Sequence, residues 1–378
     1  MIYHDFQNLK LSALGMGCMR LPHKAQYADI DQPAVQQMVD YAMARGVNYY
    51  DTAWGYHDGN SEAAIGEALS AYPREQFCLA TKFPGYDLSN MGHVKEIFEA
   101  QLRRCRVEYF DFYLFHNVCE MNIDAYLNPK YGIFDYLMEQ KKNGLIRHLG
   151  FSAHGNLDTM QCFLDAYGEH MEFCQIQLNW LDWDFQNARA KVELLNRRGL
   201  PIWVMEPLRG GSLCHLAPEH EARLRALQPD WTMTEWAFRF LQSVPGVTVT
   251  LSGMSDFEQM KQNVATFEER KPLTEEALAA LQSIAKEMTS KNTLPCTGCR
   301  YCTTHCPHCP QKLNIPWLIE LYNEHVYSGG GFIAPMALSA LDESQKPSAC
   351  LGCRSCEKVC PQKLKISEMM ADFAARLK

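Results

Sequence analysis

Residues 35–53 read VQQMVDYAMARGVNYYDTA, and this stretch contains the unit from which the fold can be predicted. Its first part has apolar residues at helical spacing, and residues 47–53 form an apolar, aromatic run typical of a buried strand. Such runs recur at nearly regular intervals along the first 290 residues. The eight candidate strands are residues 11–19, 47–53, 77–82, 109–116, 146–152, 173–179, 200–206 and 247–253.

Stretches with helical spacing, such as residues 97–105, lie between these runs, so strand and helix alternate. Eight strand and helix units within about 270 residues match a parallel (β/α)8 TIM barrel, whose strands are buried on both faces. A doubly wound open sheet is the alternative, but residues 15–18 read GMGC and do not match its G-x-G-x-x-G fingerprint. The sequence therefore predicts an α/β fold with a TIM barrel over residues 1–290.

Length and composition agree with a soluble chain of more than one domain. The 378 residues fit one large domain and a small one, and 47% hydrophobic residues supply a sizeable core. A net charge of −8 without a long basic run argues against nucleic-acid binding. The sequence has no signal-peptide pattern at its start and no apolar stretch approaching 18 residues. We therefore expect a cytoplasmic protein with neither a nucleic-acid nor a membrane partner.

Nine of the sixteen cysteines lie between positions 296 and 360. Clustered cysteines in a reducing compartment are more often metal ligands than disulfides. The pattern C-x₂-C-x₂-C occurs twice, each time followed by a Cys-Pro pair, and this spacing is typical of proteins with two [4Fe–4S] clusters. A pair of Cys₄ zinc sites is the alternative, although zinc sites usually combine two C-x₂-C pairs. The candidate ligands are Cys296, Cys299, Cys302, Cys306, Cys309, Cys350, Cys353, Cys356 and Cys360.

The fourth ligand of the first copy is ambiguous. Cys306 has the expected spacing and precedes Pro307. However, residues 309–315 match residues 360–366 at six of seven positions, which favours Cys309. The fourth cysteine of such a motif ligates the other cluster, so the local loop does not decide between them. Both cysteines are therefore candidates.

The cysteine-rich segment is expected to form a second domain. A helix over residues 274–289 and a short linker over 292–295 separate it from the barrel. Residues 317–326 have helical spacing and precede three glycines, which indicates helix, loop and helix between the two motifs. The prediction for residues 291–378 is a small, mainly α-helical domain that resembles the helical, two-cluster type of ferredoxin.

Four chemically active side chains stand at or just after the ends of three consecutive predicted strands: Asp51, Tyr56, Lys82 and His116. Strand ends of a barrel converge on one mouth, where the active sites of this fold lie. An ammonium group beside a phenol favours the phenolate, so Lys82 is expected to lower the pKa of Tyr56. Asp51 would keep Lys82 charged, and His116 would aim a substrate carbonyl. Tyr56 would then act as general acid while hydride reaches the carbonyl carbon.

With these residues the sequence resembles the aldo-keto reductase family over about residues 1–290, and in organisation the bacterial subgroup with a C-terminal ferredoxin-type domain. The motifs are residues 51–56, Lys82 after Thr81, His116 after Leu114 and Phe115, and residues 150–152, 175–179, 207–208 and 253–263. The resemblance implies reduction of aldehydes or ketones with NADPH, less often NADH, with Asp51, Tyr56, Lys82 and His116 as the catalytic tetrad.

The resemblance also implies a set of cofactor contacts. Two side chains would hold the carboxamide, three backbone amides at a helix start would meet the phosphates, and two residues would lie near the adenosine. In that order they are Ser152 and Gln175; Gly253, Met254 and Ser255; and Gln259 and Asn263. This chain departs from the family at Met205, where an aromatic residue is usual, and at Gly253 and Gln259, where cations grip the 2′-phosphate. The choice between NADPH and NADH is therefore open.

The two domains raise a question of electron flow. A nicotinamide moves two electrons as hydride, while each cluster moves one, so direct exchange is awkward without a flavin or another intermediary. The clusters are therefore expected either to serve an electron-transfer partner protein or to be structural. The predicted function is an oxidoreductase acting on a small carbonyl compound or its alcohol. The alternative is an electron-carrier or redox-sensing iron–sulfur protein on a catalytically altered barrel.

Overall fold

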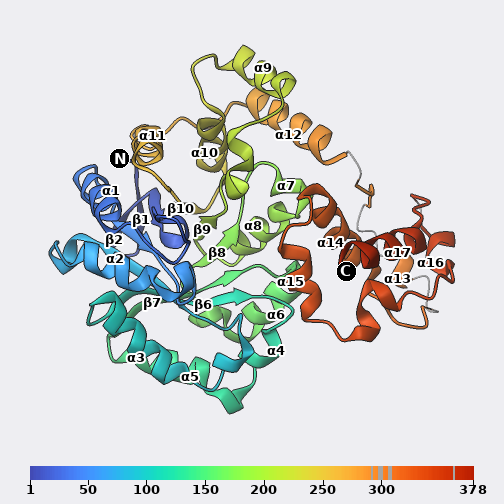
Figure 1. Cartoon of the computed structure of the whole chain (residues 1–378), viewed down its shortest axis with the longest axis horizontal. Helices are drawn as coiled ribbons and strands as arrows, with labels where there is room; N and C mark the ends of the chain where they lie inside the picture. Colours follow the sequence, from blue (N-terminus) through green and yellow to red (C-terminus); the bar gives the residue numbers. More distant parts are fainter. Residues whose placement is uncertain (291–292, 297–300, 305–308, 361) are drawn as a thin grey trace. The chain divides into compact units, whose positions relative to one another are not determined.

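A computed structural model of the chain describes residues 1–290, 293–296, 301–304, 309–360 and 362–378. The chain forms two compact units, Met1–Leu281 and Gln282–Lys378 (Figure 1). The division falls inside α12 (Glu275–Ser290), a helix that was expected over residues 274–289. None of the helices in the described part of the chain has the length and apolar character needed to cross a membrane.

The first unit contains a closed barrel of eight strands, counted over the described residues. Neighbouring strands are parallel throughout, and β10 pairs with β3 to close the ring. The strands are β3 (Leu14–Gly17), β4 (Tyr49–Asp51), β5 (Cys78–Phe83), β6 (Phe110–Val118), β7 (Ile146–Ala153), β8 (Cys174–Gln177), β9 (Ile202–Met205) and β10 (Val247–Ser252). Each predicted run overlaps one of them, and β5, β6 and β7 extend one or two residues past their runs, so the predicted TIM barrel is confirmed.

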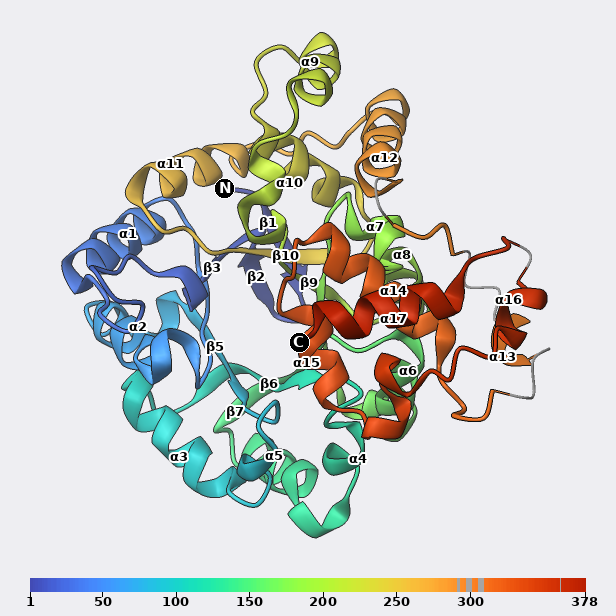
Figure 2. The ribbon, with the colours of Figure 1, turned by 45° about the vertical axis from the view of Figure 1, so that its right-hand side comes forward.

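Helices surround the barrel, as the views of Figures 1 and 2 show for α1, α2, α3 and α5. The longer helices are α1 (Gln32–Ala44), α2 (Ser61–Leu69), α3 (Val94–Cys105), α5 (Ile133–Lys142), α6 (Leu157–Tyr167), α8 (Ala188–Arg197), α9 (Pro218–Leu227), α10 (Met233–Ser243) and α11 (Phe257–Thr266). Two short ones, α4 (Ile123–Tyr126) and α7 (Asp182–Phe185), follow β6 and β8. The helix expected within residues 97–105 is the later part of α3.

The first predicted strand, residues 11–19, is wrong in its extent. Residues up to Ser12 belong to an antiparallel hairpin of β1 (Tyr3–Phe6) and β2 (Leu9–Ser12), and the barrel strand β3 begins only after it. Ser12 ends the hairpin because its hydroxyl donates to the carbonyl of Leu14 at 2.7 Å and its amide donates to Asn48 at 2.8 Å. An apolar run by itself does not reveal such a change of partner.

The hairpin covers the end of the barrel at which the strands begin. Phe6 is 4% exposed and packs against rings inside the barrel, with centroid separations of 5.6 Å to Phe112 and 5.2 Å to Trp203. The interior is filled by apolar side chains at alternate strand positions, as expected for a small barrel. This apolar cluster consists of Phe6, Leu11, Tyr49, Cys78, Ala80, Phe112, Leu114, Phe173, Trp203, Val249 and Leu251.

An ionic cluster ties the hairpin to the strands at the same end. The Glu172 carboxylate accepts hydrogen bonds from Gln7 at 2.6 Å, from His148 at 2.8 Å and from Lys141, and also from the Leu149 amide. Burial alone would raise the pKa of Glu172, but these hydrogen bonds outweigh it and lower the pKa to about 2. A carboxyl whose pKa is lowered in the folded state stabilises the fold above its unfolded pKa.

We expect Glu172→Gln to lower the free energy of unfolding by about 2 kcal/mol at pH 7. The difference from the unchanged protein should shrink as pH falls from about 4.5 through about 2, because the carboxyl is protonated first in the unfolded state and then in the folded state. Urea unfolding at a series of pH values measures this, with the exposed Glu169→Gln as matched control. A difference that does not change with pH would contradict the assignment.

In the second unit, all the regular secondary structure of the described residues is helical. The helices are α13 (Tyr301–Thr304), α14 (Ile315–Tyr327), α15 (Ile333–Ser339), α16 (Ser355–Lys358) and α17 (Ile366–Arg376), together with the later part of α12. The expected helix, loop and helix are confirmed in α14 and α15, where Gly329 and Gly330 adopt φ of 66° and 97°. The core of this unit comes mainly from α14 and α17, with Leu318, Met370 and Phe373 fully buried.

Candidate active site

A buried ion pair joins the ends of two neighbouring barrel strands. Asp51 is the last residue of β4, and Lys82 lies near the end of the adjacent strand β5. The Lys82 ammonium donates to Asp51 Oδ1 at 2.6 Å and to the Thr52 carbonyl at 2.7 Å, and its side chain is fully buried. Removing one partner of such a pair leaves an uncompensated buried charge, which is strongly destabilising.

Tyr56 lies beside this pair in η2 (Tyr56–Gly59), a short 3₁₀ segment directly after β4. The Lys82 ammonium is 5.1 Å from the centre of the Tyr56 ring. The next residue, the buried His57, fixes the conformation of this segment and has a φ of 52°. Its Nε2 accepts a hydrogen bond from the Leu21 amide at 3.0 Å, and its Nδ1 donates one to the Tyr27 carbonyl. The phenol is therefore held by a folded loop against the ammonium.

The pKa of Tyr56 is raised well above its usual value of 10. Burial is the main cause, and the negative charge of Asp51 is the second. The expectation of a lowered pKa is therefore wrong, because burial and Asp51 outweigh the effect of Lys82. Lys82 is already paired with Asp51, so its charge does not act on the phenol without compensation. Tyr56 consequently keeps its proton throughout the neutral range.

His116, on β6, is the fourth predicted residue at this place. Its ring lies 6.1 Å from that of Tyr56 and 5.2 Å from that of Tyr86, edge-on in both cases. Burial lowers its pKa well below 6.5, and the positive charge of Lys82 lowers it further. His116 Nδ1 has no hydrogen-bond partner among the described residues. The structure thus brings all four predicted catalytic residues together, with the imidazole neutral.

A second layer of polar side chains fixes the strand that carries Lys82. The buried Glu62 accepts hydrogen bonds from Thr81 at 2.7 Å and from Gln101 at 2.8 Å. Gln101 also donates to the Lys82 carbonyl at 3.0 Å. This role of Glu62 was not predicted from the sequence, although a carboxylate among the apolar positions of a helix is a usable signal.

A pocket of about 470 Å³ opens beside Asp51 and Tyr56. Of the seven residues expected to contact a cofactor, five line this pocket: Gln175, Gly253, Ser255, Gln259 and Asn263. Ser152 and Met254 are not among its lining residues, nor are Lys82 and His116. The Ser152 hydroxyl instead accepts a hydrogen bond from the Asn117 amide at 2.8 Å.

Two residues of neighbouring strands form part of the pocket wall. Gln175, on β8, is 2% exposed, and its Oε1 has no hydrogen-bond partner among the described residues. Its Nε2 lies 3.7 Å from the sulfur of Met205, the residue that stands where the family usually has an aromatic ring. A buried amide oxygen without a partner costs free energy, so a donor brought in by a ligand would be stabilising.

The start of α11 is less open to phosphate than the sequence suggested. The Ser255 amide donates to Gln259 Oε1 at 2.9 Å, and the Gln259 amide donates to the capping carboxylate of Asp256 at 2.8 Å. Arg20, a cation that was not predicted for this site, also lines the pocket. Its side chain packs close to Gly253, and a Cβ placed on that glycine would lie 3.2 Å from it. Arg20 pairs with Glu206 at 3.6 Å.

Four of the predicted cysteine ligands line one cavity in the second unit: Cys309, Cys350, Cys353 and Cys356. Three others, Cys296, Cys302 and Cys360, belong to or pack against the apolar core of that unit. Cys299 and Cys306 lie outside the described residues. Among the residues that are described, no three His, Cys, Asp or Glu side chains are close enough to hold a single metal ion.

The barrel and its strand-end pocket define a (β/α)8-barrel enzyme. The family model of the aldo/keto reductases matches residues 13–286. An uncharacterized oxidoreductase of Bacillus subtilis (strain 168) is 26% identical over 311 residues, which cover 74% of this chain and 94% of the relative. The NADH-specific methylglyoxal reductase of Escherichia coli (strain K12) is 28% identical over 224 residues, 54% of this chain and 66% of the relative.

A solved structure supports the same assignment. An aldo-keto reductase from Bacillus halodurans, in its holo form, superposes with a TM-score of 0.63 at 26% identity and covers 76% of this chain and 97% of its own. The chain therefore belongs to the aldo/keto reductase family and is an oxidoreductase.

Proposed function

We propose that the barrel reduces an aldehyde or ketone, or oxidises the corresponding alcohol, with Tyr56 as the group that exchanges the proton. The observation that carries the proposal is the buried Lys82–Asp51 pair directly beside the phenol, at the wall of a pocket large enough for a ligand. An ion pair with no exposed side-chain area on Lys82 is costly to maintain, and an active site is where such groups are used.

The side chains of this site have complementary roles in the proposed reaction. Tyr56 holds its proton at neutral pH and donates it to the carbonyl oxygen as negative charge develops there. Lys82 then stabilises the phenolate that forms, while Asp51 keeps the ammonium in position. The neutral His116 offers an N–H to the same carbonyl oxygen and so orients the substrate.

The pocket fits a nicotinamide cofactor, which supplies a hydride when bound. Gln175 has a buried oxygen without a partner among the described residues, as an acceptor for a carboxamide requires. Gly253, Ser255, Gln259 and Asn263 would lie along the rest of the dinucleotide, and Arg20 would provide a cation for its phosphates. We infer no preference between NADPH and NADH, because a glycine and a glutamine occupy the two positions that grip a 2′-phosphate in the family.

Anaerobic titration of the purified protein with NADH and NADPH tests this function. We expect at least one nucleotide to bind, and its oxidation to depend on an added aldehyde. Methylglyoxal with NADH is a reasonable first pair because of the named activity of the Escherichia coli relative. If neither nucleotide binds, the reductase proposal fails, and an electron-carrier role on an altered barrel takes its place.

We also propose that the second unit is a ferredoxin-type domain with two [4Fe–4S] clusters. Four thiolates are the donor set of such a cluster, and Cys309, Cys350, Cys353 and Cys356 line a common cavity. The place of Cys309 in this cavity supports it as the fourth ligand from the first motif. Cys360 would correspondingly join the first three cysteines of that motif, Cys296, Cys299 and Cys302.

Serine substitution separates the two candidate ligands. We expect Cys309→Ser to lose up to about half of the bound iron, because one of two clusters lacks a thiolate. Cys306→Ser is the matched control and should keep its iron. The measurement is iron and acid-labile sulfide per chain after anaerobic purification. Loss of iron in Cys306→Ser with retention in Cys309→Ser would reverse the assignment.

Such clusters would connect the enzyme to a one-electron partner in the cytoplasm, or serve as structural elements of the domain. Bleaching of cluster absorbance by NADH or NADPH, without added flavin, would demonstrate coupling between the two sites. Unchanged absorbance during carbonyl reduction would favour a structural role.

A further inference from the structure

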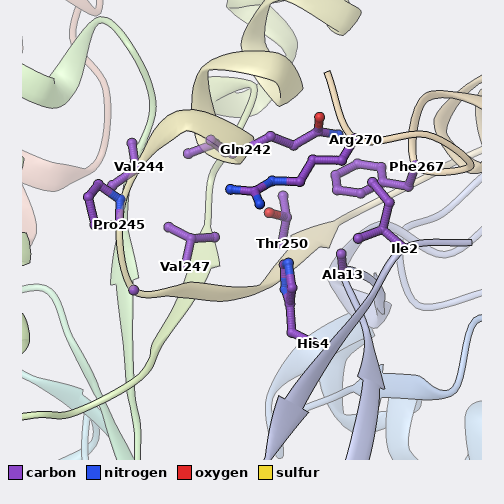
Figure 3. A pocket seen from close by; sticks show the side chains of 12 residues that line it. Ile2, His4, Ala13, Gln242, Val244, Pro245, Val247, Thr250, Phe267 and Arg270 are labelled. Carbon is purple, nitrogen blue, oxygen red and sulfur yellow. The ribbon is translucent and has the colours of Figure 1, made fainter. Parts of the chain in front are cut away.

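A second pocket lies at the opposite end of the barrel from the proposed active site. It has a volume of about 250 Å³ and is formed by the hairpin, by the beginning of β10 and by the segments that follow α10 and α11 (Figure 3). This second pocket is lined by Val247, the first residue of β10, whereas the active-site pocket is lined by Ser252, the last residue of the same strand. The two pockets share no lining residue.

The walls of this pocket are fixed by backbone hydrogen bonds between distant segments. The Ile2 amide donates to the Phe267 carbonyl at 2.7 Å, and the Ala13 amide donates to the Ile2 carbonyl at 2.9 Å. The Thr250 amide continues the series by donating to the Ala13 carbonyl at 2.8 Å. Because these bonds hold three separate segments of the chain together, the fold itself fixes the pocket walls, and binding there requires little ordering of the chain.

Gln242 lines this pocket and has a hydrogen-bond donor without a partner among the described residues. Its Oε1 accepts from Arg239 at 3.1 Å and from the Lys271 amide at 2.9 Å, so the orientation of its amide group is determined. Its Nε2 is buried and has no hydrogen-bond partner in the part of the chain that the structure describes. An amide donor left in this state costs free energy, which an acceptor on a ligand would recover.

Two further polar groups converge on the same space. Thr250 faces outward from the barrel, since its neighbours Val249 and Leu251 belong to the interior cluster. In Figure 3 the Arg270 side chain reaches across the pocket, and its guanidinium and Thr250 point towards one another. Arg270 forms no ion pair among the described residues. A cation, an amide and a hydroxyl are thus among the lining residues of this pocket, and none of the lining residues is a carboxylate.

Most of the remaining lining is apolar. Leu241, Val244, Val247 and Phe267 contribute hydrocarbon surface next to the polar groups. The volume corresponds to about eight water molecules at about 30 Å³ each, which fits a ligand of similar size in non-hydrogen atoms. A ligand complementary to this pocket carries one anionic head for the guanidinium and amide, and a short apolar body.

We propose that this pocket is a binding site for a small organic carboxylate, distinct from the active site. The carboxylate would accept hydrogen bonds from Arg270, from Gln242 Nε2 and from the Thr250 hydroxyl. Planar, two-oxygen acceptors match the geometry of a guanidinium. The hydrocarbon part would lie against Val247 and Phe267. The proposal does not depend on the reaction in the barrel mouth.

Equilibrium dialysis of the whole protein with benzoate tests the site, and uncharged benzamide serves as the isosteric probe. We expect about one benzoate per chain with a dissociation constant of about 1 mM or lower, as ligands of this size reach. Benzamide should bind at least about tenfold more weakly, because it lacks the charge that a guanidinium recognises. Absence of benzoate binding, or equal binding of the two probes, would overturn the proposal.

Three variants show where benzoate binds. Arg270→Met should weaken binding at least about tenfold, and Val247→Phe should weaken it by filling the pocket. Arg103→Met, on α3, is the matched control and should bind benzoate as the unchanged protein does. Arg270 is exposed, so its substitution should leave the fold intact even if Val247→Phe does not fold. Equal binding in Arg270→Met and Arg103→Met would assign benzoate to another site and refute the proposal.

Discussion

Tyr56→Phe is expected to lower the turnover of a carbonyl substrate by about 10²- to 10⁴-fold, the usual contribution of general acid catalysis. The substitution removes only the hydroxyl, and the ring keeps its place beside Lys82. Because the proton is donated in the transition state, the loss should appear in kcat and kcat/KM alike, with nucleotide affinity nearly unchanged. Steady-state kinetics and nucleotide titration of the same preparation give both quantities.

Tyr72→Phe is the control for the loss of a tyrosine hydroxyl. The Tyr72 hydroxyl donates to the exposed carboxylate of Asp40 at 2.6 Å, and neither residue lines the strand-end pocket. This variant should turn over at the rate of the unchanged protein. Unaltered turnover in Tyr56→Phe would refute the assignment of Tyr56 as proton donor.

Lys82→Met is expected to affect both stability and turnover. It leaves Asp51 as a buried carboxylate without its cation, and such a loss typically costs about 3–5 kcal/mol. Asp51→Asn combined with Lys82→Met removes both charges, so it should recover much of that stability. Turnover should stay low in both variants, since neither has an ammonium to stabilise the Tyr56 phenolate. Denaturant unfolding and kinetics of the two variants separate these effects.

Arg74→Met is the control for weakening a buried ion pair away from the site, and Asp111 keeps a second cation, Arg147, at 3.4 Å. Arg74 bonds to Asp111 at 2.6 Å, and the Asp111 side chain is only 3% exposed. Asp111 lies at the beginning of β6, the end of the strand opposite to His116. This control should lose stability while each folded molecule keeps its turnover. If Lys82→Met behaved in the same way, Lys82 would be a structural residue only.

The barrel could be predicted from the sequence because each of its strands is buried on both faces. Such strands appear as apolar runs, and the eight runs correspond to the eight strands of the ring. The hairpin was not predicted, since residues 11–12 continue an apolar run without a break in composition. Only the hydrogen bonds of Ser12 and its new partner strand distinguish it from β3.

The site was predictable to the extent that it depends on position along strands. Asp51, Lys82 and His116 lie at or near the ends of neighbouring strands, so topology alone brings them together. The direction in which the pKa of Tyr56 is shifted was not predictable, because the shift depends on how deeply the phenol is buried and on how well Asp51 neutralises Lys82. The pocket at the opposite end of the barrel was not predicted for a similar reason: Gln242, Thr250 and Arg270 come from separate segments that only the fold combines.

The most direct test of the central claim is the pH dependence of carbonyl reduction after Tyr56 is replaced by a fluorinated tyrosine. Fluorination lowers the pKa of the phenol with little change in its size. If Tyr56 donates the proton, the decline of kcat at high pH should move to lower pH in the fluorinated protein, because its phenol ionises earlier. A decline at the same pH in both proteins would mean that another group supplies the proton, and the proposed mechanism would be wrong.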